Sequence, residues 1–407
     1  MVQPLRSRPL WGWWLLARTP GVLSLVVGWP HHYVRREASD VNLYRQWSSY
    51  VAHGLLPYRD FRVEYPPGVM PVMELRPLHA ASFRIEFVAL AVIVDALVLN
   101  ALSRRPEHRR GCWVWIAAPV ALGSIEWARL DIFVAAALVA AVLAFEREHD
   151  LRAGAWLGFA ALIKLWPLAL VVAFVAILPG RRGRAILAGT GATLVAFTVP
   201  VLAWGGWSGL RWMLGDQLGR GVQVESLPAV PLMLARQAGA SERVVFAHGA
   251  SEVQGPWATG LAIASTAVML LALLALVIFL RVRQVPAGAA SAIVLIVVMV
   301  VIMTGKVLSP QYLIWAVAAV AVSIDSIDRP RLLFGWTMGA LAVTQLEYPL
   351  LYWTLARHGW RGTTVAVVHG VAVLGFALVA ITRGLATCEK PRSVTGASRA
   401  VSGTLSS

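Results

Sequence analysis

Charged residues are scarce in this 407-residue chain: they fill 14% of the positions, while hydrophobic residues fill 58%. Soluble domains carry roughly a quarter charged residues, so the composition excludes an ordinary soluble protein. Apolar runs of about 16 to 25 residues recur along most of the chain, and a run of this length crosses the hydrocarbon core of a bilayer. Because the runs are continuous and do not alternate with polar residues, a transmembrane barrel is excluded. We therefore expect an all-α polytopic membrane protein.

Cysteine is also scarce, and several sequence motifs are missing. Cys112 and Cys388 lie near opposite ends of the chain, which implies neither a disulfide framework nor a metal-ligand pair. The His-Glu-x-x-His and Cys-x-x-Cys patterns are absent, and His31 with His32 forms only an isolated pair. The chain also lacks a phosphate-binding Gly-x-x-x-x-Gly-Lys loop and a dinucleotide fingerprint. We expect no cofactor, no metal and no machinery for nucleotide-activated substrates.

Acidic residues are too few to balance the basic ones, and the formal net charge is +15. Basic cytoplasmic loops and contacts with anionic membrane lipids explain this excess better than nucleic-acid binding does. Basic residues recur in four short connections, near residues 104–110, 181–184, 281–283 and 329–331. The positive-inside rule places these connections and both termini in the cytoplasm.

Twelve apolar segments are candidate membrane spans, and about ten to thirteen crossings are expected because several segments are short. The segments are 10–29, 83–102, 112–126, 130–146, 153–163, 165–180, 184–204, 257–280, 287–304, 311–324, 332–347 and 363–382. The basic N-terminus lacks a small-residue cleavage pattern, which predicts an uncleaved signal anchor. Residues 1–385 should form one integral membrane domain, with long outer segments at 30–82 and 205–256. Residues 386–407 should form a disordered cytoplasmic tail.

Polar residues gather in the first outer segment, directly after the first span. Asp40 and Tyr44 lie in a stretch whose Trp47 and Tyr50 recur at roughly helical spacing, which predicts an interfacial helix. An acid at the membrane surface is a candidate general base for an attacking hydroxyl. The alternative is that Ser39 or Asp40 only caps this helix.

The same outer segment continues into a rigid, charged turn. Arg59, Asp60, Arg62 and Glu64 precede the turn 65–68, which reads Tyr-Pro-Pro-Gly. The prolines fix φ and the glycine permits a sharp bend. The arginines could contact a phosphate or pair with the neighbouring acids, and these acids could instead bind sugar hydroxyls.

Four more polar clusters fall on the same predicted outer side. They are Arg129 with Asp131, Lys164 between two apolar runs, Arg220 with Gln223 and Glu225, and Lys306 with Gln311. Ionisable groups at membrane depth are costly and usually line a cavity, so their convergence predicts a site there. Simpler readings remain open: Arg129 and Asp131 could pair across their turn, and Lys164 could extend to the interface.

Taken in order, these motifs resemble glycosyltransferase family 87, integral membrane enzymes of the C-type glycosyltransferase fold. The matching pieces are Asp40 with Tyr44, residues 56–61 with 64–68, residues 129–131, Lys164 before Pro167, residues 220–227, and Lys306 with residues 309–312. They extend over about residues 38 to 315 of the sequence printed above. Any one motif is weak, but six in order are fairly specific to the family and not to one substrate.

The resemblance implies a concrete activity. The similar enzymes transfer a sugar, mannose in the actinobacterial members, from a polyprenyl-phosphate carrier to a hydroxyl of a glycolipid or envelope glycan. They work on the outer face of the plasma membrane, invert the anomeric carbon and need no metal, because a polyprenyl phosphate is a good leaving group. Asp40 matches their proposed base. Candidate cations for the donor phosphate are, in order, Lys306, Arg220, Lys164 and Arg129. Candidate sugar- or acceptor-binding residues are Tyr44, Asp60, Glu64, Tyr65, Asp131, Gln223, Glu225, Gln311 and His358, with His369 a weaker choice than His358.

Two other functions fit the same composition. A transporter or flippase of lipid-linked sugars would also place polar groups around one cavity, although such proteins often show interrupted helices in both halves. A non-catalytic scaffold of a cell-envelope assembly is the third hypothesis. Because the polar clusters crowd into the outer segments, chemistry at one surface is favoured over passage across the membrane.

Overall fold

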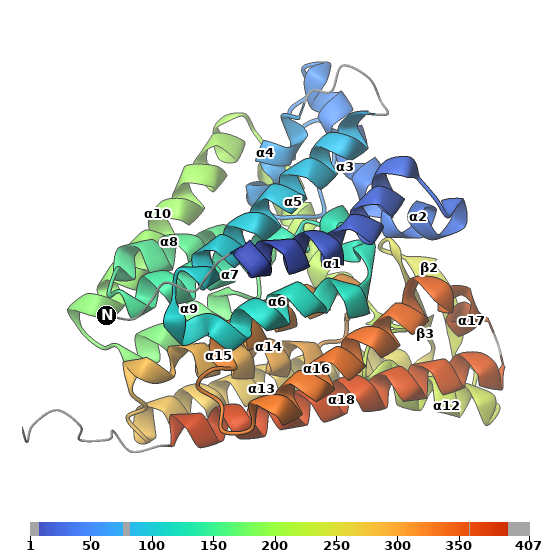
Figure 1. The fold of residues 1–407 in the computed structure, drawn as a ribbon. Helices are drawn as coiled ribbons and strands as arrows, with labels where there is room; N and C mark the ends of the chain where they lie inside the picture. The colour runs from blue at the N-terminus through green and yellow to red at the C-terminus, as the bar shows by residue number, and fades with distance from the viewer. Residues whose placement is uncertain (1–7, 76–81, 358, 390–407) are drawn as a thin grey trace, which may run out of the picture.

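A computed structural model describes residues 8–75, 82–357 and 359–389, and these are nearly all helical (Figure 1). The helices before residue 204 are α1 (Arg8–Val27), α2 (His31–Glu37), α3 (Ser39–Ala52), α4 (Met70–Met73), α5 (Ser82–Ser103), α6 (Arg109–Leu122), α7 (Asp131–Glu146), α8 (Asp150–Ala161), α9 (Leu168–Ile177) and α10 (Arg181–Ala203). The later helices are α11 (Trp207–Gly219), α12 (Ala229–Gln237), α13 (Pro256–Val282), α14 (Ala290–Thr304), α15 (Leu313–Ser323), α16 (Pro330–Gln345), α17 (Tyr352–Ala356) and α18 (Trp360–Cys388). The predicted all-α class is confirmed.

Six helices in the described part of the chain are long and apolar enough to cross a membrane. They are α1, α5, α10, α13, α14 with the turn before it, and α18. The other six predicted segments are also helices, but they are shorter: α6, α7, α8, α9, α15 and α16. Polar connections end several of them early, since Arg129 lies between α6 and α7 and Lys164 lies between α8 and α9. The protein is therefore a polytopic membrane protein with both long and short apolar helices.

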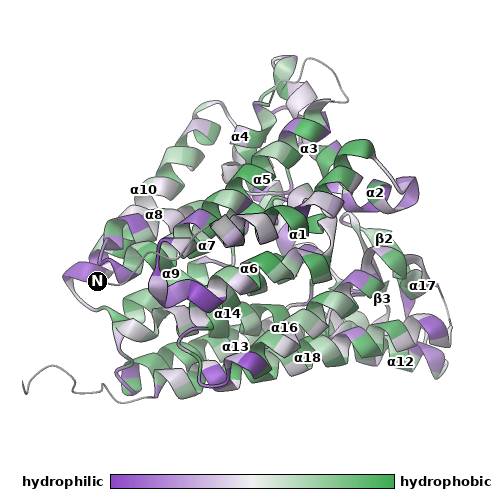
Figure 2. Cartoon of the chain, viewed as in Figure 1, coloured by the Kyte–Doolittle hydropathy of each residue, from purple (hydrophilic) through white to green (hydrophobic). Residues whose placement is uncertain are grey.

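Burial separates central helices from peripheral ones. Every residue of α15 is buried, and so is most of α14, which packs against α18 and α13. Helices α1, α10 and α13 keep most of their apolar side chains exposed, as expected of helices that face lipid. Figure 2 shows hydrophobic residues along most of these helices, with hydrophilic ones gathered toward their ends. An apolar surface of this kind needs a bilayer to cover it.

The arginine inside the first span has a buried partner. Nε of Arg18 lies 2.8 Å from Oδ2 of Asp95 in α5, and both side chains are almost fully buried. The guanidinium also donates to the carbonyl oxygens of Trp115 and Ile116 in α6. Indole N–H groups of Trp115 and Trp127 donate to the same carboxylate. The pair thus satisfies both charges at membrane depth and joins α1, α5 and α6.

The two long segments that were predicted to lie outside the membrane both contain secondary structure. The first contains α2, α3 and α4, so a helix is present as α3 where an interfacial helix was predicted. The second contains α11, α12 and a three-stranded antiparallel sheet of β1 (Val222–Gln223), β2 (Arg243–Ala247) and β3 (Ala250–Gln254), in the order β1-β3-β2. A tight turn at His248 and Gly249, both with positive φ, joins β2 to β3. These strands were not predicted, because strands this short leave little periodic signal in the sequence.

The C-terminal boundary differs from the prediction. Helix α18 continues through Cys388, so the first residues of the predicted tail, 386–388, are helical. The tail from Pro391 onward lies outside the described residues. Cys112 and Cys388 are buried and unpaired, as their spacing indicated.

Candidate active site

Asp40 and Arg129 form an ion pair at the N-terminal ends of two helices. Nη1 of Arg129 lies 3.1 Å from Oδ1 of Asp40. Asp40 lies in the first turn of α3, and Arg129 precedes α7. The Asp40 side chain remains 27% exposed, while that of Arg129 is only 4% exposed. A carboxylate that is held by a buried cation and still open on one side can receive a proton from a bound molecule.

The capping alternative for Asp40 is not what the geometry shows. The N-cap of α3 is Ala38, and no side chain caps the helix. Ser39 instead accepts a hydrogen bond from Nη2 of Arg129, at 3.1 Å. The same nitrogen lies 3.2 Å from the hydroxyl of Tyr348, which donates to the carbonyl oxygen of Arg36. Arg129 is thus held by several groups and can orient Asp40.

The Tyr-Pro-Pro-Gly turn packs against the connection that carries Lys164. The backbone N–H of Gly68 donates to the carbonyl oxygen of Leu162, at 2.9 Å. A Cβ on Gly68 would lie 2.8 Å from that oxygen, so only glycine permits this approach. Nζ of Lys164 lies 4.5 Å from the ring centre of Tyr65 and 5.1 Å from that of Tyr312. The ammonium group therefore makes cation–π interactions with both tyrosine rings.

Asp131 and Tyr44 lie between Asp40 and Lys164. Asp131 is fully buried at the start of α7 and interacts electrostatically with Lys164, Asp40 and Arg129. Neither of its carboxylate oxygens makes a hydrogen bond of ordinary geometry with a described residue. Asp131 forms no ion pair with Arg129 across the turn, since the guanidinium of Arg129 pairs with Asp40. Tyr44 packs edge-on against Tyr65, with ring centres 6.3 Å apart.

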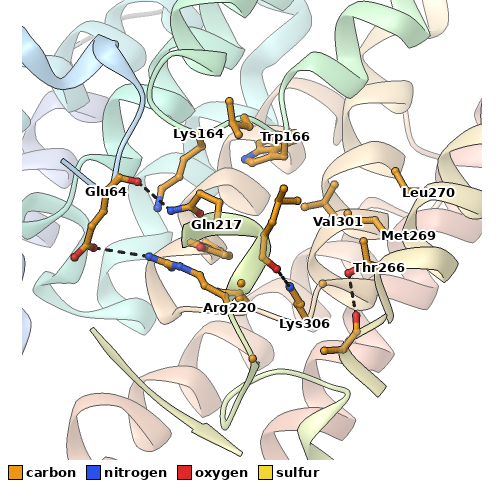
Figure 3. A pocket seen from close by; sticks show the side chains of 18 of the residues that line it. Glu64, Lys164, Trp166, Gln217, Arg220, Thr266, Met269, Leu270, Val301 and Lys306 are labelled. Atoms are coloured by element: carbon orange, nitrogen blue, oxygen red, sulfur yellow. Dashed lines mark hydrogen bonds and ion pairs between the residues drawn. The ribbon is translucent and has the colours of Figure 1, made fainter. Parts of the chain in front are cut away.

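A cavity of about 720 Å³ opens beside Lys164 (Figure 3). One side carries polar groups: Glu64, Tyr65, Lys164, Gln217, Arg220 and Lys306. The opposite wall is apolar and includes Ile263, Met269 and Leu270 of α13 and Val301 of α14. Helix α13 leaves most of its residues unburied, so the apolar wall continues onto an apolar surface of the molecule. Such a cavity suits a molecule with an anionic head and a hydrocarbon chain.

Neither Arg220 nor Lys306 forms a short ion pair with a carboxylate among the described residues. Nη2 of Arg220 lies 3.8 Å from Glu64, and its Nε lies 3.8 Å from Asp216. Nζ of Lys306 donates to the carbonyl oxygen of Leu218, at 2.8 Å. Burial raises the pKa of Glu64, although Arg220 opposes the shift. Burial also lowers the pKa of Lys306, and the carboxylate of Glu252 opposes this shift.

Other predicted residues support the site from outside the cavity. The backbone N–H of Gln223 donates to the carbonyl oxygen of Lys306, and its side chain donates to Ser309. These bonds join β1 to the connection before α15, where Gln311 is buried. Gln223 therefore positions Lys306.

Glu225 belongs to a different buried group. It lies close enough to Glu347 for the two carboxylates to interact, and burial raises the pKa of Glu225 well above its usual value. Oε2 of Glu347 lies 2.8 Å from Nδ1 of His369. His369 is thus paired with an acid from the turn that contains Tyr348. His358 lies outside the described residues.

Asp60 does not line the cavity. It accepts hydrogen bonds from Arg59, at 2.9 Å, and from the backbone N–H of Leu56. The Arg59 interaction lowers the pKa of the exposed Asp60 carboxyl. Arg62 stacks over Trp212, 5.0 Å from the ring centre. Glu64 lies near Arg220 instead of pairing with Arg62.

Glu37 and Tyr348 also surround Arg129, and neither was predicted from the sequence. Glu37 is fully buried at the end of α2, accepts a hydrogen bond from Ser124, and interacts electrostatically with Arg129. Burial raises the pKa of this carboxyl to about 8. Its place only three residues before Asp40 was a visible signal. Tyr348 lies far away in the sequence and carried no such signal.

Most of the residues of this site lie within a region that matches a known family. A sequence model of glycosyltransferase family 87 matches residues 64–310. The match contains Glu64, Arg129, Lys164, Arg220 and Lys306, while Asp40 precedes it. No curated protein matches the chain. Because the matched region exceeds half of the 407 residues, the chain belongs to glycosyltransferase family 87.

Proposed function

We propose that the protein transfers a sugar from a polyprenyl-phosphate donor to a hydroxyl of a lipid-linked or envelope glycan, with inversion at the anomeric carbon. The observation that carries this proposal is the cavity that joins an apolar wall on α13 and α14 to Lys164, Arg220 and Lys306. A polyprenyl chain would lie along the apolar wall, and its phosphate would meet the three cations. Mannose is the sugar we propose, on the family resemblance alone.

The reaction needs one base and one set of cations. Asp40 takes the proton from the acceptor hydroxyl, whose oxygen attacks the anomeric carbon from the face opposite the phosphate. The bond from that carbon to the phosphate oxygen breaks, and its electron pair leaves with the polyprenyl phosphate. Lys306, Arg220 and Lys164 stabilise the charge that develops there. Arg129 orients Asp40, and no step calls for a metal.

We place this reaction on the outer face of the plasma membrane. Asp40, Glu64 and Lys306 lie in or beside the segments that the basic-loop pattern assigns to that side. The basic connections at residues 104–110 and 181–184 would then lie in the cytoplasm with both termini. The donor is a lipid that can be presented at the outer face.

The test is transfer of radiolabelled sugar from polyprenyl-phosphate mannose to membrane lipids by the purified protein. Asp40→Asn should lower turnover by about a hundredfold or more, the usual contribution of a general base. Lys306→Ala should lower it by about tenfold or more, as expected for a lost charged hydrogen bond. Lys306→Arg should retain much of the activity.

Asp328→Asn is the matched control. Asp328 is a partly exposed carboxylate that also pairs with an arginine, Arg383, at 3.3 Å, between α15 and α16. Its loss should leave turnover unchanged. Full turnover of both Asp40→Asn and Lys306→Ala would refute the proposed site. Passage of the donor across vesicle membranes without its consumption would favour a transporter.

A further inference from the structure

A second cavity, of about 410 Å³, lies at the other end of α5 and α7 from Asp40. Its basic lining residues are Arg104, Arg105, Arg147, His149 and Arg152. None of the described residues that line it is acidic. We call it the basic pocket. It is not part of the candidate active site.

The helices place the basic pocket and the active site on opposite faces of the molecule. Asp131 begins α7 and Arg147 follows its last residue. A helix of this length spans about 24 Å at 1.5 Å per residue. Arg104 likewise follows α5, whose first half contacts Tyr44 through Phe87. The basic pocket therefore lies near the opposite membrane surface.

One arginine of the pocket serves the fold. Arg105 is buried, donates to the carbonyl oxygen of Leu143 at 2.9 Å, and lies 3.3 Å from Glu146. It joins the connection after α5 to the end of α7. The charge of Arg105 is therefore already neutralised, and Arg105 is not the main group that would bind an added anion.

The other three arginines have no such partner. Arg104, Arg147 and Arg152 are exposed, and their side chains make no hydrogen bond or ion pair with another described residue. The nearby acids are already occupied, because Arg182 binds both Asp150, at 2.7 Å, and Glu148, at 3.2 Å. Three unpaired guanidinium groups around one pocket attract an oxyanion that can accept several hydrogen bonds, such as a phosphate.

Apolar side chains also line the basic pocket. Leu97 of α5 is 58% exposed and Trp156 of α8 is 44% exposed, and both line it. Leu151 of α8 is exposed beside them. In a membrane protein such side chains meet acyl chains, and tryptophan favours the headgroup layer. The pocket therefore offers cations for a headgroup and an adjoining surface for its hydrocarbon chains.

We propose that the basic pocket binds the phosphate group of an anionic phospholipid. The arginines supply the hydrogen bonds, and Leu97 and Trp156 contact the acyl chains. Basic pockets between membrane helices commonly hold anionic headgroups. This site also uses part of the net charge of +15, and it does not depend on the proposed transferase activity.

The test measures thermal unfolding of the purified chain in a neutral detergent. Added phosphatidylglycerol should raise the melting temperature of the wild type, because a ligand that binds the folded state stabilises it. Phosphatidylcholine at the same concentration should not. The double variant Arg147→Gln/Arg152→Gln should lose at least half of the shift. Native mass spectrometry should show fewer bound phosphatidylglycerol molecules on that variant.

The matched control is Arg281→Gln/Arg283→Gln, which removes the same charge from two exposed arginines at the C-terminal end of α13. It should keep the full shift. An equal loss in the control, or no shift in the wild type, would overturn the proposal. A shift of the same size with inorganic phosphate would show an anion site that does not select lipid. If the double variant does not fold, Arg104→Gln gives the same readout at one exposed side chain.

Discussion

Nη1 of Arg129 lies 3.1 Å from Oδ1 of Asp40, and this ion pair joins the start of α3 to the start of α7. Arg129 is buried and Asp40 is partly exposed, so the pair presents a carboxylate on a fixed support. The arginine also bonds Ser39 and the hydroxyl of Tyr348. The position of the proposed base therefore depends on a residue from a different helix.

Arg129→Lys should retain the charge and lose the additional hydrogen bonds, since a lysine cannot reproduce the planar guanidinium fork. We expect turnover to fall by about tenfold or more, with little change in KM for the donor. Steady-state kinetics with labelled donor would measure both. Tyr348→Phe removes one of these bonds and should have a smaller effect. A rise in KM with unchanged turnover would contradict a positioning role.

The resemblance and the apolar runs together predicted much of this architecture. All twelve predicted segments are helical, because long apolar runs with few charges favour helices at membrane depth. The six clusters also predicted that Glu64, Lys164, Arg220 and Lys306 belong near one another, and one cavity brings these four together. Asp40 does not line that cavity, but it interacts electrostatically with Tyr65, which does, and with Asp131.

Contacts between distant segments were not readable from the sequence. Local pairing of Arg129 with Asp131 was the simple alternative, and the structure instead pairs Arg129 with Asp40. Tyr348 reaches Arg129 from a turn after α16 that carries no motif, and Glu347 of the same turn pairs with His369 instead. Asp60 sits in a motif but faces away from the cavity, since its oxygens bind Arg59 and the backbone of Leu56. Such contacts depend on how the helices pack.

Gly68→Ala should destabilise the protein and displace Lys164. The new Cβ would lie 2.8 Å from backbone and side-chain atoms of Leu162, so the turn or the Lys164 connection must shift. Overpacking of this kind typically costs about 1–3 kcal/mol. Thermal unfolding and KM for the donor would measure the two effects. Gly339→Ala on α16, where a Cβ meets nothing within 4 Å, should leave both unchanged or slightly raise stability.

Glu37 should make stability depend on pH. Burial raises the pKa of this carboxyl from 4.5 to about 8. The folded state therefore holds a proton that the unfolded chain releases above pH 4.5. Stability is full below that pH and is lost as pH rises toward about 8, by up to about 1.4 kcal/mol per pH unit.

Glu37→Gln removes this ionisation and should flatten the dependence. Melting temperatures of wild type and variant between pH 5 and 9 would test this, with the two curves diverging as pH rises. Glu107→Gln is the control, because that carboxyl is exposed and hydrogen bonding lowers its pKa instead of raising it. A variant whose melting temperature falls with pH as steeply as that of the wild type would contradict the role of Glu37.

Filling the apolar part of the cavity should discriminate between donors by chain length. Thr266 of α13 lines the cavity, and its hydroxyl donates a hydrogen bond to the carbonyl oxygen of Ala262. The substitution Thr266→Trp therefore places a large ring against the apolar wall. KM for a long-chain polyprenyl-phosphate sugar should rise by about tenfold, while KM for a short-chain analogue should change less, because each buried methylene contributes about 0.8 kcal/mol. Leu271→Trp, on an exposed position of α13 outside the cavity lining, is the matched control and should leave both KM values unchanged. An equal rise for both donors in Thr266→Trp would place the hydrocarbon chain elsewhere.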